Sequence, residues 1–215
     1  VFDYGKAEGD YYYMAMELLE GRTLREAIRQ QAPFHEERVL HITRQICRSL
    51  REAHGQGVIH RDLKPANIFL VQHGDEEDHV KVLDFGLVKN LNDTDQQQTQ
   101  AGICMGSPKY MSPEQVTGSK VDGRTDVYAL GVLMFEMLTG KVPFDHGNGM
   151  STIMAHVTED VPSMRSVRPD LALSADLERV VMRCLSKTPD ARYKSMDDLL
   201  IALKLSGGAV TSTQS

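Results

Sequence analysis

The first thirty residues alternate between short apolar runs and polar turns, and they then change to a helical spacing. Tyr11 to Leu19 is rich in aromatic and aliphatic residues and predicts a strand that pairs with Val1 to Tyr4 across a glycine-containing turn. Thr23 and Glu26 form a T-x-x-E pattern that predicts a capping box at the start of a short helix, from about Leu24 to Gln31. The N-terminal part therefore predicts a hairpin followed by one short helix.

Longer helices are predicted after this point. Glu36 to His54 carries apolar residues, including Cys47, at a spacing near 3.6, which gives one buried face. Val127 to Thr139 is almost wholly apolar and is followed by Gly140, so this helix should be buried on most sides, with Asp126 able to cap its start. The remaining expected helices are Ser151 to Thr158, Ser174 to Leu185 with Ser174 as cap, and a last one that begins with a Ser195–Asp198 capping box and ends near Leu205.

Two apolar runs in the middle of the chain predict a β-hairpin. They are Ile68 to Val71 and Val80 to Leu83, and a polar spacer with a glycine separates them. A hairpin brings its outer ends together, which places Asn67 beside Asp84. An amide oxygen and a carboxylate are the hard oxygen ligands that Mg²⁺ prefers when phosphates complete its shell.

Two further polar residues lie just before this hairpin. Asp62 can accept a hydroxyl proton, and Lys64 supplies a cation beside a phosphoryl group in transfer. A second acidic stretch, His73 to His79, is better interpreted as a solvated hairpin tip than as a metal site, because nothing fixes its ligands in space. The chemistry that we expect is therefore phosphoryl transfer at the base of the hairpin.

Composition narrows the class of protein. The 215 residues suit one domain or one large lobe, and 41% hydrophobic and 25% charged residues are usual for a soluble globular protein. The net charge of −6 and the lack of a Lys/Arg tract argue against nucleic-acid binding. Cys47, Cys104 and Cys184 have no C-x-x-C spacing, which suits a reducing compartment. The longest apolar stretch, Val127 to Leu138, contains Glu136 and is too short to cross a bilayer, so we expect a cytoplasmic segment without membrane contact, whatever anchors the parent protein elsewhere.

Four motifs resemble those of a protein kinase. H-R-D-L-K-P-A-N-I-F-L at His60 to Leu70 is similar to the catalytic loop, and K-V-L-D-F-G at Lys81 to Gly86 to the metal-binding loop. G-S-P-K-Y-M-S-P-E, ending at Glu114, resembles the substrate-docking loop and the A-P-E motif. C-L-S-K-T-P-D-A-R, ending at Arg192, resembles the motif whose arginine pairs with that glutamate. The resemblance extends over Val1 to about Leu205 and is greatest to the bacterial Ser/Thr kinases.

The resemblance implies roles for individual residues. Asp126 would support the catalytic loop from below, and the hydroxyl of Ser107 would contact Asp62 and Lys64. The catalytic group would be Asp62, Lys64, Asn67 and Ser107; the nucleotide contacts would be Met16 as gatekeeper, the backbone of Glu17 and Leu19, Phe69 and Asp84; and the Mg²⁺ ligands would be Asn67 and Asp84.

The implied fold is α+β and protein-kinase-like: a mainly α-helical C-lobe with small β-hairpins, and an N-lobe that is largely absent. Residues 1–205 would form a partial catalytic domain and residues 206–215 a flexible linker or tail. The Gly-rich loop and the phosphate-binding lysine would lie upstream of Val1, so we expect this segment alone to catalyse poorly.

The implied activity is transfer of the ATP γ-phosphate, with Mg²⁺, to Ser/Thr hydroxyls of protein substrates in signalling. Its partners would be ATP, those substrates and the N-lobe of the same protein. Lys64 favours a Ser/Thr over a tyrosine substrate. The alternatives are a pseudokinase or scaffold module, and, with less support because of Glu114 and Arg192, a small-molecule phosphotransferase.

The resemblance also predicts a regulatory switch in the loop after D-F-G. Arg61 precedes Asp62, and kinases with an arginine there are commonly activated by phosphorylation of this loop. Thr99 is the better candidate for the phosphate, with Lys89 as a second cation, because Thr94 lies between two aspartates.

Overall fold

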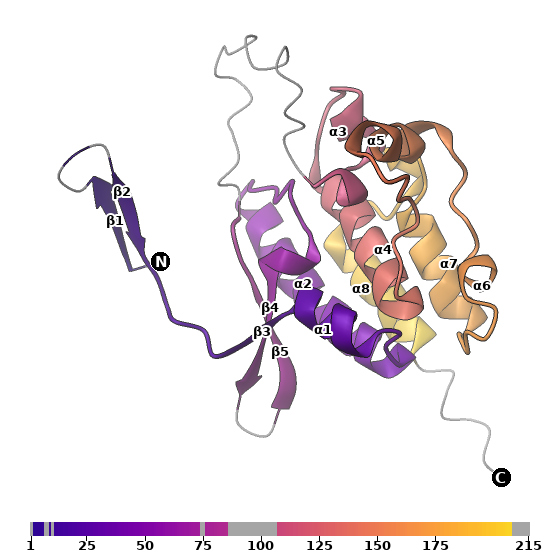
Figure 1. Ribbon diagram of the computed structural model, residues 1–215, viewed down its shortest axis with the longest axis horizontal. Helices are drawn as coiled ribbons and strands as arrows, with labels where there is room; N and C mark the ends of the chain where they lie inside the picture. Colours follow the sequence, from indigo (N-terminus) through magenta and orange to yellow (C-terminus); the bar gives the residue numbers. More distant parts are fainter. Residues whose placement is uncertain (1, 7–8, 10, 74–75, 86–106, 208–215) are drawn as a thin grey trace.

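The computed structural model describes residues 2–6, 9, 11–73, 76–85 and 107–207, without side-chain detail for residues 73, 76 and 77. Figure 1 shows a small two-stranded sheet that stands apart from a body of packed helices, with a three-stranded sheet along one side of that body. The two small sheets beside a mainly helical body agree with the predicted α+β class.

The first sheet is an antiparallel hairpin of β1 (Asp3–Lys6) and β2 (Tyr12–Ala15), with Asp3 opposite Ala15. The predicted strand over Tyr11 to Leu19 was therefore too long. Residues 16–20 form an extended connection, and β3 (Gly21–Thr23), which was not predicted, pairs with β4. Aromatic side chains raise strand propensity, but they do not say where pairing stops.

The second sheet has the order β3-β4-β5, where β4 is Ile68–His73 and β5 is Glu76–Val82. Ile68 lies opposite Val82 and the ladder continues past the apolar runs to His73 and Glu76. The strands are thus longer than predicted, because backbone pairing also holds polar residues. Gly21 has φ +155°, and a Cβ there would lie 2.2 Å from the carbonyl oxygen of Leu70, so this edge requires glycine.

The helices pack around one buried helix, α4 (Gly123–Thr139). The others are α1 (Leu24–Gln31), α2 (Glu36–Gly55), α3 (Pro113–Val116), α5 (Gly149–Thr158), α6 (Met164–Val167), α7 (Ala175–Cys184) and α8 (Met196–Ser206). Short 3₁₀ helices η1 (Pro65–Asn67), η3 (Pro108–Tyr110) and η4 (Pro189–Ala191) lie between them. Nearly every residue of α4 is buried, whereas α2 and α7 are amphipathic and pack against it. None of the described helices is both long and apolar enough to span a bilayer.

The caps confirm some predictions and correct others. Thr23 and Glu26 form the predicted capping box, and Ser174 caps α7. Helix α4 starts four residues earlier than predicted, and Asp122, not Asp126, caps it. Ser195 caps α8 by accepting from the Asp198 backbone N–H, but the reciprocal half of the predicted box is absent there.

Close packing of α4 on α7 depends on one small residue. A Cβ on Gly131 would lie 2.7 Å from the Cβ of Cys184, so any larger residue at 131 would push the two helices apart. Cys184 and Cys47 are both buried, and burial raises the pKa of each thiol, so neither is a reactive group.

Candidate functional site

The loop that follows α2 is held from below by the buried helix α4. The carboxylate of Asp126 is fully buried and accepts hydrogen bonds from the backbone N–H groups of His60 and Arg61, both at 2.9 Å. It also accepts from Nε2 of His54 at 2.7 Å. Asp126 therefore supports the loop, as the resemblance implied, and does not serve as a helix cap. The role of His54 was not predicted from the sequence.

Two residues near the site adopt a left-handed backbone. Arg61 has φ +66° and Asp84 has φ +58°, values that residues with a Cβ seldom take. The hydrogen bond from the backbone N–H of Arg61 to Asp126 helps to hold Arg61 in this conformation. Non-glycine residues in this region persist where the surrounding structure fixes them, and they cluster at functional sites.

His60 connects this loop to the residues after β5. Its Nδ1 accepts from the backbone N–H of Asp62 at 3.3 Å, so Nε2 carries the proton and donates to the carbonyl of Leu83 at 2.9 Å. The imidazole is 1% exposed and lies 5.1 Å from the ring of Phe85, centroid to centroid. The two segments that flank the hairpin are thus fixed to one another.

The base of the hairpin brings Asn67 and Asp84 to neighbouring positions. The backbone N–H of Leu83 donates to the carbonyl of Asn67 at 2.8 Å, which continues the β4-β5 ladder by one step. The side chain of Asn67 is buried and its Nδ2 donates to the carbonyl of Asp62 at 2.9 Å, so its amide oxygen remains available. Asp84 is exposed, and its carboxylate has no hydrogen-bond or ion-pair partner among the described residues.

Asp62 and Lys64 contact each other directly. Nζ of Lys64 lies 2.5 Å from Oδ2 of Asp62, and both side chains are largely buried. Ser107 lies at the start of η3, but within the described part of the chain its hydroxyl bonds neither of these residues. Gln115 in α3 does reach the loop: its Nε2 donates to the carbonyl of Arg61 at 2.7 Å. Sequence reasoning missed Gln115.

The predicted nucleotide contacts lie in the connection after β2 and in β4. Met16 and Glu17 are exposed in the connection after β2, and Leu19 is half-buried. Phe69 is half-buried in β4, directly opposite Lys81 of β5, so both side chains lie on the same face of the sheet. Nζ of Lys81 reaches the carboxylate of Glu17 at 3.3 Å. This ion pair joins the segment after β2 to the sheet that contains Phe69.

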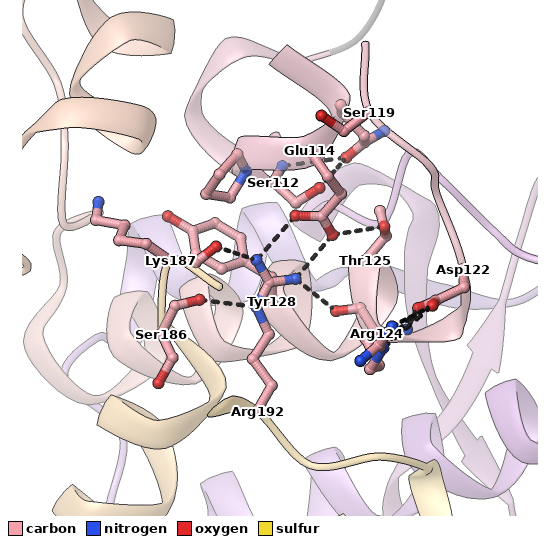
Figure 2. Close-up of polar contacts among 12 residues, drawn as sticks. Ser112, Glu114, Ser119, Asp122, Arg124, Thr125, Tyr128, Ser186, Lys187 and Arg192 are labelled. Atoms are coloured by element: carbon pink, nitrogen blue, oxygen red, sulfur yellow. Dashed lines mark hydrogen bonds and ion pairs between the residues drawn. The ribbon is translucent and has the colours of Figure 1, made fainter. Parts of the chain in front are cut away.

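A buried ion pair joins the segment after η3 to the C-terminal part of the chain. The carboxylate of Glu114 takes two bonds from Arg192, from Nη1 to Oε1 at 2.7 Å and from Nη2 to Oε2 at 2.8 Å (Figure 2). Arg192 is fully buried and Glu114 is 5% exposed. This confirms the predicted pairing of the two residues.

Every N–H of the Arg192 guanidinium has an acceptor. Beyond Glu114, the group donates to three backbone carbonyls at 2.8–3.0 Å, and it lies 4.8 Å from the centre of the Tyr128 ring (Figure 2). Thr125 donates a third bond to Glu114 at 2.7 Å. Burial opposes the ionisation of Glu114, but the bonds from Arg192 and Thr125 and the charge of Arg192 outweigh it, so the pKa of Glu114 is lowered.

The segment that contains η3 is fixed at two more points. Tyr110 donates to the carboxylate of Glu136 on α4 at 2.7 Å, and burial raises the pKa of Glu136. Lys109 forms an ion pair with Asp145 at 2.5 Å. Thr94, Thr99, Lys89 and Cys104, by contrast, lie outside the described residues, as does the predicted tail beyond residue 207.

Comparison with known proteins agrees with this arrangement. The protein kinase domain family matches residues 4–201. The chain is 42% identical over 199 residues to the serine/threonine-protein kinase pkn3 of Myxococcus xanthus, covering 92% of this chain and 36% of the relative. It is 39% identical over 202 residues to PknB of Mycobacterium tuberculosis, covering 93% and 31%. The chain thus spans about a third of the length of these curated relatives.

A solved structure shows the same fold. The crystal structure of the Mycobacterium tuberculosis PknI kinase domain is similar with a TM-score of 0.70 and 27% identity, over 95% of this chain and 70% of that one. The match of the family to almost the whole chain, together with the catalytic-loop geometry and the buried Glu114–Arg192 pair, shows that the chain belongs to the protein kinase family.

Proposed function

We propose that this chain carries the catalytic residues of a Ser/Thr protein kinase, which transfers the γ-phosphate of ATP to Ser/Thr hydroxyls of protein substrates in signalling. The single observation that carries the proposal is the loop fixed by Asp126. This loop carries Asp62, Lys64 and Asn67, which are a few positions apart in the sequence. The base of the β4-β5 hairpin places Asp84 beside Asn67.

Asp62 is the residue that we propose to accept the proton of the substrate hydroxyl. Its carboxylate is mostly shielded from solvent. Among the described residues Lys64 contacts the Oδ2 oxygen of this carboxylate, and no bond to Oδ1 is found. Lys64 would then stabilise negative charge that develops on the transferred group. Because the loop cannot shift without breaking the bonds to Asp126, these groups are preorganised.

Asn67 and Asp84 fit the demands of a Mg²⁺ ion. The Asn67 amide oxygen is oriented by the bond from its own Nδ2 to Asp62, and the Asp84 carboxylate is free of described partners. Amide and carboxylate oxygens are ligands that Mg²⁺ prefers, and phosphates and water would complete its shell. When bound, Mg²⁺ would offset the negative charge on the phosphates of ATP, which would donate the phosphoryl group.

We further propose that an N-lobe of the same protein completes the nucleotide site above Met16, Glu17, Leu19 and Phe69. The support comes from β1 and β2: an isolated two-stranded hairpin is only marginally stable in water, and this one exposes many aromatic side chains. Those at least 48% exposed are Phe2, Tyr4, Tyr11, Tyr12 and Tyr13. Additional strands over this surface would bury them.

The test uses the full-length protein with two isosteric variants. Asp62→Asn should lower the phosphotransfer rate by about 10²–10⁴-fold while nucleotide affinity is kept, because only the proton acceptor is lost. Asp84→Asn should weaken Mg²⁺-dependent binding of a fluorescent ATP analogue. Asp197→Asn, an exposed carboxylate on α8, is the control and should change neither quantity. Near-normal turnover of Asp62→Asn would refute the assignment.

A further inference from the structure

A basic stripe lies on the outer face of α2, on the opposite side from its apolar core-facing residues. His41, Arg44, Gln45 and Arg48 are spaced i, i+3, i+4 and i+7, which places them on one face of the helix. Together with His79 of β5 they line a hollow of about 330 Å³. We call this hollow the α2 groove.

Arg44 and Arg48, the two arginines of the α2 groove, differ in their ion pairing from the other arginines discussed on α2. Arg38 forms two bonds with Asp78, at 2.6 and 3.0 Å, and Arg51 pairs with Asp197 at 3.2 Å. Neither Arg44 nor Arg48 has a carboxylate partner among the described residues. Like charges at i and i+4 destabilise a helix, so this pair is locally unfavourable unless an anion offsets it.

One N–H donor of the Arg44 guanidinium also has no hydrogen-bond acceptor among the described residues. One Nη2 N–H donates to the carbonyl of Leu203 on α8 at 2.6 Å, which holds the guanidinium in place. The Nε of the same side chain is buried and has no acceptor within the described part of the chain. A buried unsatisfied N–H of a charged group is costly, and an anionic oxygen is the acceptor that best satisfies it.

The groove has a rigid wall. Gln45 uses both atoms of its amide to hold β5: Oε1 accepts from the backbone N–H of Val80, and Nε2 donates to the carbonyl of Asp78, each at 3.0 Å. The strand that carries His79 is therefore fixed against the helix that carries the arginines. A site of this kind is formed before its ligand binds.

The size of the basic cluster indicates which kind of anion fits the α2 groove. Arg44 and Arg48 are one turn apart, roughly 6 Å along the helix, which suits one dianionic group with several acceptor oxygens. A nucleic acid would need a longer stripe, and the net charge of −6 would repel both a polyanion and an anionic membrane. A concave site with a partly buried arginine is instead reached by a phosphate on a flexible side chain.

We propose that the α2 groove binds the phosphate of a phosphorylated Ser or Thr in a polypeptide. The groove is separate from the catalytic loop: Arg44 lies eleven residues before Gly55, the last residue of α2, which is roughly 16 Å along the helix. Binding there needs neither ATP nor Asp62, so this proposal stands or falls independently of the proposed function.

The test measures binding to the full-length protein without nucleotide. A synthetic phosphoserine peptide with uncharged neighbours should bind, and its unphosphorylated twin should not, in isothermal titration calorimetry. Arg48→Gln should weaken the phosphopeptide affinity by about tenfold, the effect expected for one charge-assisted hydrogen bond. Arg48 is exposed and no bond to it is found among the described residues, so this variant should fold normally, whereas Arg44→Gln also loses the bond to Leu203.

The matched control is Arg51→Gln, which removes the same charge from the same helix outside the groove and should leave the affinity unchanged. Displacement of the peptide by inorganic phosphate, with loss of affinity at higher salt, would add support. Equal binding of both peptides, equal effects of Arg48→Gln and Arg51→Gln, or Arg48-dependent binding to phosphatidylserine vesicles that exceeds binding to the peptide would each overturn the proposal.

Discussion

Arg192→Ala is the substitution whose cost can be worked out most fully from the structure. It removes both bonds to Glu114 and leaves that carboxylate buried with Thr125 as its remaining side-chain donor. Three backbone carbonyls lose their donor at the same time. Breaking a buried ion pair from one side costs roughly 3–5 kcal/mol, because the stranded charge keeps its desolvation penalty.

The expected change in melting temperature follows from chain size. For a domain of 150–250 residues, 1 kcal/mol shifts the Tm by about 2–4 °C. Arg192→Ala should therefore lower the Tm by about 6–20 °C, and urea unfolding at pH 7 should show the corresponding loss of free energy. Because Arg192 and Glu114 are in contact, the double variant Glu114→Gln/Arg192→Ala should cost less than the sum of the single changes.

The cost of Arg192→Ala should also depend on pH. The folded-state pKa of Glu114 is lowered, so its contribution to stability is present above its unfolded pKa of about 4.5 and is lost as the pH falls through the folded value. In the variant, the bonds and charge of Arg192 no longer oppose burial, so the pKa of the Glu114 carboxyl group rises even though the Thr125 bond remains. The difference in stability between the two proteins should therefore be largest near neutral pH and shrink under acidic conditions.

Arg51→Ala provides the control, because it removes one exposed arginine that pairs with Asp197. Exposed pairs contribute about 0–1 kcal/mol, so its Tm should stay close to that of the wild type. If Arg192→Ala lowered the Tm no more than Arg51→Ala does, the pair would not stabilise the fold and the reasoning above would be refuted.

Three further substitutions test single contacts. Gly131→Ala should lower the unfolding free energy by about 1–3 kcal/mol, measured by urea titration, because its Cβ would meet that of Cys184; Gly55→Ala, which places a Cβ in open space at an ordinary φ, should not show this loss if packing is the cause. Thr23→Ala should cost about 1 kcal/mol by the same method through loss of the α1 cap, and an unchanged midpoint would contradict this. Asp126→Asn should slow phosphotransfer by the full-length protein while the fold, followed by circular dichroism, is kept, since the amide has a single acceptor oxygen and one of the two backbone N–H groups loses its acceptor; unchanged turnover would contradict this.

Local sequence signals predicted the helices well and the strand limits poorly. The bounds of α1 follow directly from Thr23 and Glu26 at its start and from Pro33 just after its end, because caps and proline act locally. The β3 strand could not be predicted, since three residues pair with β4 only through contacts distant in sequence. Asp126 was wrongly predicted to cap α4, because its actual partners, the backbone N–H groups of His60 and Arg61, are also distant in sequence.

The candidate site likewise contains features that the sequence predicted and features that it did not. The juxtaposition of Asn67 and Asp84 follows from hairpin geometry, which a sequence pattern contains. The roles of His54 and Gln115 do not, because each acts through one hydrogen bond to a residue more than 50 positions away. The motif alone suggested that Ser107 meets Asp62, yet the described structure has Lys64 at that carboxylate.

The anchoring of the catalytic loop by Asp126 has a consequence for how the amide protons of that loop exchange with solvent. His60 and Arg61 lie outside any helix or strand, where backbone N–H groups usually exchange fast through local opening. Their acceptor, however, sits on the most deeply buried helix of the chain, so the two protons can be released only when packing around α4 gives way. Their exchange rates should therefore match those of the α4 core, and the loop would lose its shape at the same free energy as the whole helical body.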